Sequence, residues 1–214
     1  MNPDMTPSFS DADHPLPMVV LASASPRRRA MLTQAGVKHR VQPASIDDGD
    51  LLPGEGINAE QWVAALAYLK AISSARTIDD PAIQGKLVVI GADTVCVHEG
   101  QIIGQPRDRE HAKEIIEQMS GTTHEVLTGV AILDPNGDRR ELFVDRSVVT
   151  VGEIPDGEIE AYLDSMMWRG KAGAYNITER LAAGWPITFT GDETSIVGLP
   201  MTRTFERVAR FFFD

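Results

Sequence analysis

Two groups of side chains in the sequence have the types and spacing needed for chemistry on a phosphorylated compound. The first is the segment 23–29, which reads Ser-Ala-Ser-Pro-Arg-Arg-Arg and follows the apolar run 18–22. The second is Asp93, the only charged residue in the apolar run 87–97. Hydroxyls, free N–H groups at a helix start and clustered guanidinium groups bind anions, most simply phosphates. A carboxylate on a rigid strand can hold a metal ion or act as a general base.

The arginines are unusual for a helix start, because the helix dipole is already positive there. The sequence predicts a helix from Pro26, with Ser25 as its N-cap and Gly36 at its end. We expect Arg27 and Arg28 to bind an anion together with Ser23 and Ser25. Arg29 is better explained as solvated surface, because successive helical residues point about 100° apart. Solvated surface is also the competing interpretation of the other two arginines.

An unpaired buried carboxylate is costly, so Asp93 needs a partner or a cleft. A structural salt bridge is the simpler explanation, and a metal ligand or general base is the one that the pattern favours. Thr94 offers a hydroxyl beside it. Asp47 and Asp48 follow Ile46 at a strand end, where sites in α/β proteins gather, so one of them is a candidate metal ligand.

Two lysines could add positive charge. Asn58 and Gln61 form a capping-box pattern at the start of a helix that carries Lys70 beside its apolar stripe. A lysine there either extends to solvent or reaches an anion. Lys171 lies in the glycine-rich segment 168–176, where small residues allow a ligand close to the backbone. The apolar stripe expected for the helix that carries Lys70 is Trp62, Leu66, Leu69 and Ile72.

Composition limits the classes of function. Lys plus Arg is 20 and Asp plus Glu is 31, which gives a formal net charge of −11. Nucleic-acid binding needs a broad basic surface, so this balance argues against it. No apolar stretch approaches the roughly 18 residues of a membrane span. A single cysteine, Cys96, excludes an internal disulfide and fits a reducing compartment. We therefore expect a cytoplasmic protein with no membrane or nucleic-acid partner.

Strands and helices alternate along the chain, which indicates an α/β fold with a twisted mixed sheet flanked by helices. Residues 1–17 are expected to form a disordered tail and 18–214 a single domain. A helix from Asp156 should turn Ile159, Tyr162, Leu163 and Met166 inward. Residues 185–190 and 194–197 are expected to pair as a last hairpin, before a terminal helix that begins near Pro200.

Four motifs in this order resemble the Maf family of nucleotide pyrophosphatases: the segment 23–29, Gly-Ala-Asp-Thr at 91–94, Lys-Ala-Gly-Ala-Tyr at 171–175 and Val-Gly-Leu-Pro at 197–200. The match covers about residues 18–213. The resemblance implies a two-lobed α/β fold around a cleft, in many members dimeric, so that a homodimer is expected. It also implies hydrolysis of nucleoside triphosphates to monophosphate and pyrophosphate with Mg²⁺ or Mn²⁺, and a link to inhibition of septum formation.

By motif, Asp93 is the catalytic carboxylate and, with Asp48, a metal ligand. The substrate-binding positions implied by the resemblance are Ser23, Ser25, Arg27, Arg28, Lys70, Thr94, Lys171 and Thr178. Two residues depart from the pyrimidine-type pattern: Gln105 replaces a lysine, and Thr178 replaces a glutamine that accompanies selectivity for dTTP and UTP. The expected substrates are therefore dTTP, UTP or modified nucleotides. The alternative that these replacements motivate is a non-catalytic nucleotide-binding regulator of septation.

Overall fold

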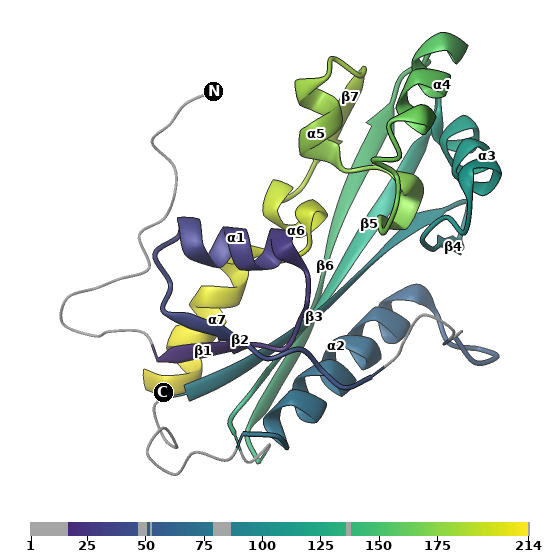
Figure 1. The fold of residues 1–214 in the computed structure, drawn as a ribbon. Coiled ribbons are helices and arrows are strands. Elements are labelled where there is room, and N and C mark those ends of the chain that lie inside the picture. The colour runs from purple at the N-terminus through teal and green to yellow at the C-terminus, as the bar shows by residue number, and fades with distance from the viewer. Residues whose placement is uncertain (1–16, 47–50, 52, 79–86, 136–137, 214) are drawn as a thin grey trace. The chain divides into compact units, whose positions relative to one another are not determined.

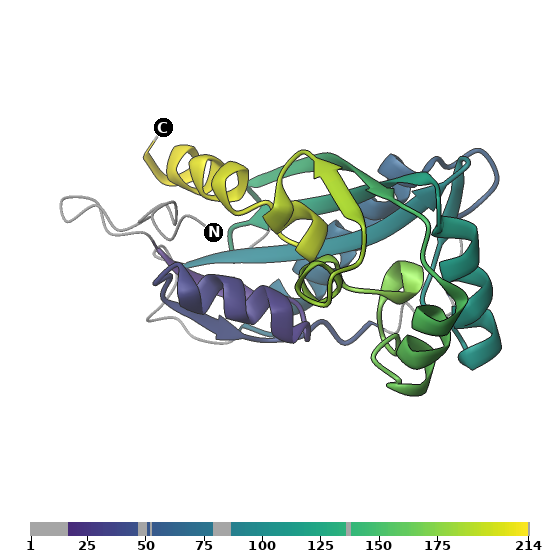
Figure 2. The same ribbon diagram turned by 90° about the horizontal axis from the view of Figure 1, so that it is seen from above.

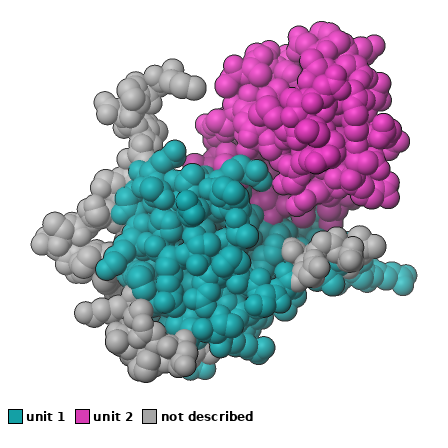
Figure 3. Space-filling model, in the orientation of Figure 1, with its two compact units in different colours: residues 1–93, 129–144, 198–214 teal, residues 94–128, 145–197 magenta. Residues whose placement is uncertain are grey.

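The computed structural model describes residues 17–46, 51, 53–78, 87–135 and 138–213 (Figure 1). It confirms the expected α/β class with a mixed sheet. Hydrogen-bonded strands follow the order β2-β1-β3-β5-β6-β7, and β4 pairs with β3. The chain divides into two compact units, which Figure 3 colours separately. Unit 1 holds residues 1–93, 129–144 and 198–214, and unit 2 holds residues 94–128 and 145–197.

The element bounds agree closely with the sequence pattern up to residue 164. The strands are β1 (Met18–Leu21), β2 (His39–Val41), β3 (Leu87–His98), β4 (Gln101–Ile103), β5 (Thr123–Leu133), β6 (Arg140–Val151) and β7 (Ile187–Thr190). The helices are α1 (Pro26–Gln34), α2 (Ala59–Ala75), α3 (Arg109–Met119), α4 (Asp156–Asp164), α5 (Ile177–Ala182), α6 (Glu193–Val197) and α7 (Met201–Phe213), with a 3₁₀ turn η1 (Ala172–Ala174).

In unit 1, β1 pairs in parallel with both β2 and β3, with Leu21 opposite Val41 and Ile90. Successive residues of a strand point to opposite faces of the sheet. On one face, Val88, Ile90 and Ala92 belong to a core cluster with residues of α1 and α7. On the other face, Leu87 and Val89 belong to a second cluster with residues of α2. Figure 2 shows α1 and α7 together on the near side of the sheet.

Helix α2 lies against the sheet at backbone contact distance. A Cβ on Gly91 would lie 2.2 Å from the carbonyl oxygen of Ala67, and one on Gly129 would lie 2.5 Å from that of Val63. The residues of α2 nearest to Gly91 are accordingly small, Ala67 and Ala71, while Val63 and Leu66 are buried on the same helix. The expected stripe was therefore wrong in part, because Leu69 is 41% exposed. The capping box of Asn58 and Gln61 is confirmed, with both reciprocal hydrogen bonds present.

Unit 2 has its own core, which gathers residues from α3, α4, α5 and the strands around them. Residues 98–101 form a turn, and Cys96 pairs with Ile103 and His98 with Gln101 in an antiparallel β3–β4 hairpin. Asp108 caps α3, because its side chain accepts a hydrogen bond from the backbone N–H of His111.

Two expectations about unit 2 were wrong. Residues 193–197 form the helix α6 rather than a strand, because the Asp192 carboxylate accepts hydrogen bonds from both the N–H and the hydroxyl of Thr194, at 2.8 and 2.7 Å. β7 pairs instead with β6, with Val149 opposite Phe189. Met166 lies beyond the end of α4 and is 53% exposed, so it does not face the core. Among the described residues, no helix is long and apolar enough to cross a membrane.

The contact between α2 and β3 gives a testable prediction. Gly91→Ala would push a methyl group into the backbone of Ala67 and Ala71, at 2.2 and 2.7 Å, and a backbone cannot move aside as a side chain can. We expect a loss of about 3 kcal/mol or more in the free energy of unfolding, measured by urea denaturation. Gly157→Ala is the matched control, because its Cβ would meet nothing within 4 Å. An equally small effect in both variants would contradict the close contact.

Candidate functional site

The segment after β1 is organised by hydrogen bonds within unit 1. The hydroxyl of Ser23 accepts from Nη1 of Arg28 at 2.9 Å and from the backbone N–H of Ser25 at 3.2 Å. Nε of Arg28 donates to the carbonyl oxygen of Gly198 at 2.7 Å. Ser25 occupies the N-cap position of α1 as predicted, although its side chain makes no capping hydrogen bond. Arg28 thus connects two of the recognised motifs, the loop after β1 and Val-Gly-Leu-Pro.

The three successive arginines have different surroundings. Arg28 is 8% exposed, Arg27 is half-buried and Arg29 is exposed. Arg27 makes no hydrogen bond or ion pair with the part of the chain that the structure describes, whereas Arg28 is engaged inside the protein. The role of both in anion binding stays a prediction. Arg27 is the one whose guanidinium is uncommitted within the described residues.

Asp93 forms a salt bridge with Lys70 of α2, with Nζ and Oδ1 2.7 Å apart. The carboxylate is buried, and Asp93 lies on the same face of β3 as Gly91, where α2 packs. Asp93 therefore has the partner that its burial requires. That partner is Lys70, which the sequence also marked as a candidate. The salt bridge that was the simpler explanation of Asp93 is present. The catalytic role of Asp93 stays a prediction.

Strand register brings the two sets of residues to neighbouring strands of unit 1. The backbone N–H of Ala22 donates to the carbonyl of Ile90 at 2.9 Å, so the chain leaves β1 beside the segment of β3 that leads to Asp93. The carboxyl end of a parallel strand is where ligands of open α/β sheets bind. Helices α1 and α2 pack on opposite faces of the sheet. The segment that adjoins β3 at the end of β1 is therefore the loop between β1 and α1.

Thr94 points to the other face of β3 from Asp93, because neighbouring strand residues alternate. Its hydroxyl lies 2.9 Å from that of Thr128, which donates to the carbonyl of Ser195 at 2.8 Å. A hydroxyl has one hydrogen to donate, so Thr94 is the donor to Thr128. Thr94 therefore takes part in a chain of hydrogen bonds within unit 2, and the hydroxyl does not share a face with the Asp93 carboxylate.

Lys171 precedes η1 and forms an ion pair with Glu179 of α5. The turn has two successive residues with left-handed backbone, Gly173 at φ 71° and Ala174 at φ 63°. Three hydrogen bonds hold it: Gly173 N–H to the carbonyl of Gly104 at 3.1 Å, Tyr162 hydroxyl to the carbonyl of Ala174 at 3.0 Å, and the Tyr175 hydroxyl to His124 at 3.0 Å. Thr178 is exposed and makes no side-chain hydrogen bond with the described residues.

Sequence reasoning missed Glu179, the helix α5 and the contact between His124 and Tyr175. The pattern Asn176-Ile-Thr-Glu179 was a usable signal, because Asn followed three residues later by Glu is typical of a helix start. The Asn176 side chain does accept from the backbone N–H of Glu179, at 3.0 Å. No comparable local signal marks His124, which meets Tyr175 only through the fold.

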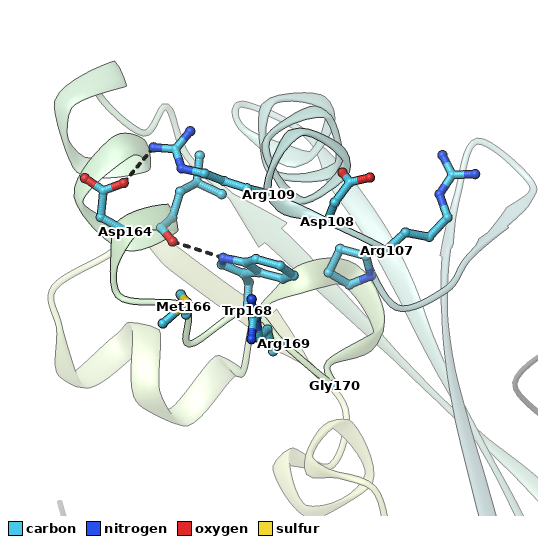
Figure 4. Close-up of a pocket in the computed structure, with 10 residues that line it drawn as sticks. Arg107, Asp108, Arg109, Asp164, Met166, Trp168, Arg169 and Gly170 are labelled. Atoms are coloured by element: carbon cyan, nitrogen blue, oxygen red, sulfur yellow. Dashed lines mark hydrogen bonds and ion pairs between the residues drawn. The ribbon is translucent and has the colours of Figure 1, made fainter.

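A pocket of about 490 Å³ lies in unit 2 between the start of α3 and the segment after α4 (Figure 4). Trp168 forms part of its wall, with its indole N–H donating to the carbonyl of Leu163 at 3.0 Å. Arg109 is paired with Asp164 at 2.7 Å. None of the site residues predicted from the sequence lines this pocket, so it gives no support to their roles.

The expected metal ligand Asp48 lies outside the described residues. In the part of the chain that is described, no three His, Cys, Asp or Glu side chains come together as a metal cage. Asp93 remains a suitable oxygen ligand, because Mg²⁺ is commonly bound by one or two carboxylates and completed by substrate phosphates and water. The donor set is thus compatible with a metal shared between protein and substrate.

Arg28 is expected to stabilise the fold through the two hydrogen bonds of its guanidinium, to Gly198 and Ser23. Arg28→Lys keeps the charge and loses this geometry, so we expect the free energy of unfolding to fall by about 1.5–3 kcal/mol. Arg29→Lys, at an exposed position of the same turn, should change it by less than about 0.5 kcal/mol. Urea denaturation of both variants measures the difference, and equal effects would refute the structural role.

His124 makes stability depend on pH. Burial, aided by the charge of His98, lowers the pKa of His124 to about 4. In the unfolded chain the pKa of the His124 imidazole is near 6.5, so below that pH the unfolded state binds a proton that the folded state does not bind until lower pH. The stabilisation is complete above about pH 6.5 and is lost as the pH falls towards 4, with a total of about 3 kcal/mol. Thermal denaturation between these pH values should show this slope, and His124→Gln should flatten it.

The comparisons with known proteins agree with these motifs. A family model described as "Maf-like protein" matches residues 18–211. The chain is 36% identical to a protein of Pelotomaculum thermopropionicum over 92% of this chain and 97% of the other, and 38% identical to one of a Geobacillus species over 90% and 97%. Both are named dTTP/UTP pyrophosphatase.

A weaker likeness is to a structure titled nucleoside-triphosphatase / dITP/XTP pyrophosphatase from Mycobacterium abscessus, at 15% identity and a TM-score of 0.39, over 64% of this chain and 76% of the other. So low a score does not establish a shared fold. The family model and the two relatives each extend over nearly the whole chain. The protein therefore belongs to the Maf family.

Proposed function

We propose that the protein hydrolyses nucleoside triphosphates to nucleoside monophosphates and pyrophosphate. The observation that carries this proposal is the buried carboxylate of Asp93, which forms a salt bridge with Lys70. Asp93 lies on β3, the strand that pairs with β1, and the loop of Ser23 and Ser25 follows β1. The names of the relatives support dTTP and UTP as substrates, and modified nucleotides are the further candidates. The proposal treats residues 18–214 as one catalytic domain of a cytoplasmic enzyme, which is matched over 18–211 by the family model.

The loop after β1 would bind phosphate oxygens. Backbone N–H groups at the start of α1 and the guanidinium of Arg27 are suited to a polyanion. Arg28 would act mainly on the loop itself, since its hydrogen bonds to Ser23 and Gly198 fix the loop's conformation before any ligand arrives. A site that is preformed in this way loses little entropy when it binds.

Asp93 would be the group that accepts the proton of the attacking water. The water oxygen forms a bond to the α-phosphorus, the bond from that phosphorus to the bridging oxygen breaks, and pyrophosphate leaves with the electron pair. The Lys70 ammonium, 2.7 Å from Oδ1, fixes the orientation of the carboxylate. Mg²⁺ or Mn²⁺ held by Asp93 and Asp48 would neutralise phosphate charge and lower the pKa of a bound water.

Asp93→Asn tests the central role directly. Asn has the same shape and can still accept a hydrogen bond from Lys70, so the fold should survive, whereas the side chain no longer takes up a proton. We expect kcat for pyrophosphate release to fall by about two orders of magnitude or more. Asp138→Asn, at an exposed position of unit 1, is the control that should keep wild-type turnover. Near-normal kcat in Asp93→Asn would exclude the carboxylate as the base.

Product analysis tests which bond is cleaved. A panel of common, methylated and deaminated nucleoside triphosphates, assayed with Mg²⁺ and with Mn²⁺, should give monophosphate and pyrophosphate in equal amounts. Nucleoside diphosphate with orthophosphate would show attack at a different phosphorus. Nucleotide binding without product, for every member of the panel, would favour the non-catalytic regulator instead.

A further inference from the structure

The pocket between the start of α3 and the segment after α4 lies wholly within unit 2, and no step of the proposed function uses it (Figure 4). Its volume of about 490 Å³ falls in the range of small-molecule sites, about 300–1,000 Å³. The charged side chains of its lining are three arginines, Arg107, Arg109 and Arg169, and two acids, Asp108 and Asp164. Which of these charges are balanced inside the protein decides what the pocket can hold.

Both acids of the pocket are engaged with neighbouring groups. The Asp108 carboxylate accepts a hydrogen bond from the backbone N–H of His111 at 2.8 Å, and it lies at the positive end of the α3 dipole. The Asp164 carboxylate accepts from Arg109 at 2.7 Å, and Arg109 also donates to Glu160 at 2.6 Å. The negative charge of the lining is therefore offset, and these ion pairs join α3 to α4.

Arg107 and Arg169 carry the positive charge that remains. Neither forms an ion pair with the part of the chain that the structure describes, although acidic residues outnumber Lys and Arg by 31 to 20. The guanidinium of Arg169 lies 5.4 Å from the ring centre of Trp168, which holds its plane while the N–H groups at its edge stay available. Arg107 is exposed and extends away from Trp168 in Figure 4. Since it has no such ion pair to break, its long side chain can turn over the pocket when an anion binds.

The wall after α4 is fixed before any ligand binds. The indole N–H of Trp168 donates to the carbonyl of Leu163 at 3.0 Å, and the backbone N–H of Arg169 donates to that of Met166 at 3.3 Å. Met166 has left-handed backbone, φ 55°, at a position after a helix where glycine is usual. Its side chain is 53% exposed and lines the pocket, so burial in the core does not account for a methionine there. Backbone strain of this kind gathers at ligand sites.

We propose that this pocket binds a phosphate group, with the guanidinium groups of Arg169 and Arg107 donating to its oxygens. The two side chains come from segments on either side of the pocket, and Arg109 stays with Asp164 as part of the wall. A phosphate group offers oxygens to donors from several directions, whereas the two oxygens of a carboxylate lie in one plane. Free phosphate, pyrophosphate and phosphomonoesters all carry this group, and the exposed Met166 would contact the organic part of an ester. The inference goes beyond the proposed function and does not depend on it, because binding here needs no turnover.

The indole N–H of Trp168 gives a readout specific to this pocket. In ¹H–¹⁵N spectra of the full-length protein, Trp168→Phe identifies its resonance among those of the three tryptophans. Inorganic phosphate, pyrophosphate and uridine monophosphate, titrated at constant ionic strength, should shift this resonance to saturation. Arg107→Gln combined with Arg169→Gln should raise the Kd about tenfold or more, the effect of lost hydrogen bonds between charged groups. Arg76→Gln combined with Arg210→Gln, at exposed positions of unit 1, removes the same charge and should leave the Kd within about twofold.

Three results would overturn the inference. They are a Trp168 resonance that saturates with none of the three anions, equal effects of the two double variants, and loss of the shift in Arg27→Gln, which would place the anion at the loop after β1. If the inference holds, the anion that binds most tightly identifies the source of the phosphate group. Failure of the proposed function is a separate result, because pyrophosphate release would be missing while the Trp168 titration is unchanged.

Discussion

The contact of α2 with the sheet is the constraint on which the rest of unit 1 depends. Gly91 and Gly129 have no side chains, so the backbone of α2 lies where a Cβ atom would otherwise be. This short distance lets Lys70 reach a carboxylate two residues along β3 from Gly91. With a larger residue at either glycine, the helix would lie further from the strand. Asp93 would then lose the partner that offsets the desolvation cost of its burial.

The cations predicted to bind phosphate are for the most part already engaged. Arg28 donates to a carbonyl and a hydroxyl, Lys70 pairs with Asp93, and Lys171 pairs with Glu179. A positive group that has an internal partner costs less to bury than a free one. The same partner must be displaced or shared when an anion binds. The ion pairs therefore limit which of the cations can contribute to substrate affinity, and they single out Arg27.

The sequence predicted the elements of unit 1 and the start of unit 2 well, because their signals are local. Continuous apolar runs marked β1 and β3, and Asn58 and Gln61 marked the start of α2. The errors have physical causes. The stripe of α2 was wrong at Leu69, because a large apolar residue was expected to be buried there, whereas the small residues Ala67 and Ala71 make the close contact with Gly91. Residues 194–197 were expected to form the second strand of a hairpin, although the Asp192 side chain begins a helix there.

The sequence identified most of the candidate site residues, but it did not show which residues they contact. Asp93 and Lys70 were each noted, and only the fold shows that they meet. Arg28 and Ser23 were placed in one loop, but the link from Arg28 to Gly198 joins residues 170 positions apart. His124 and Glu179 were absent from the prediction, because their significance arises from contacts with the turn at residues 171–175. Asp48 is outside the described residues, so its role as a ligand remains a prediction.

The pleat of β3 has a consequence for how this segment can change over evolutionary time. Asp93 and Thr94 serve different faces only because each residue reverses the direction of the one before it. Substitutions can accumulate around them while this alternation persists. An insertion or deletion of a single residue between Gly91 and Asp93 would exchange the two faces at once, placing the acid on the face of Thr128 and the hydroxyl against α2. This strand should therefore tolerate a change of chain length less well than a conservative change of side chain at most of its positions.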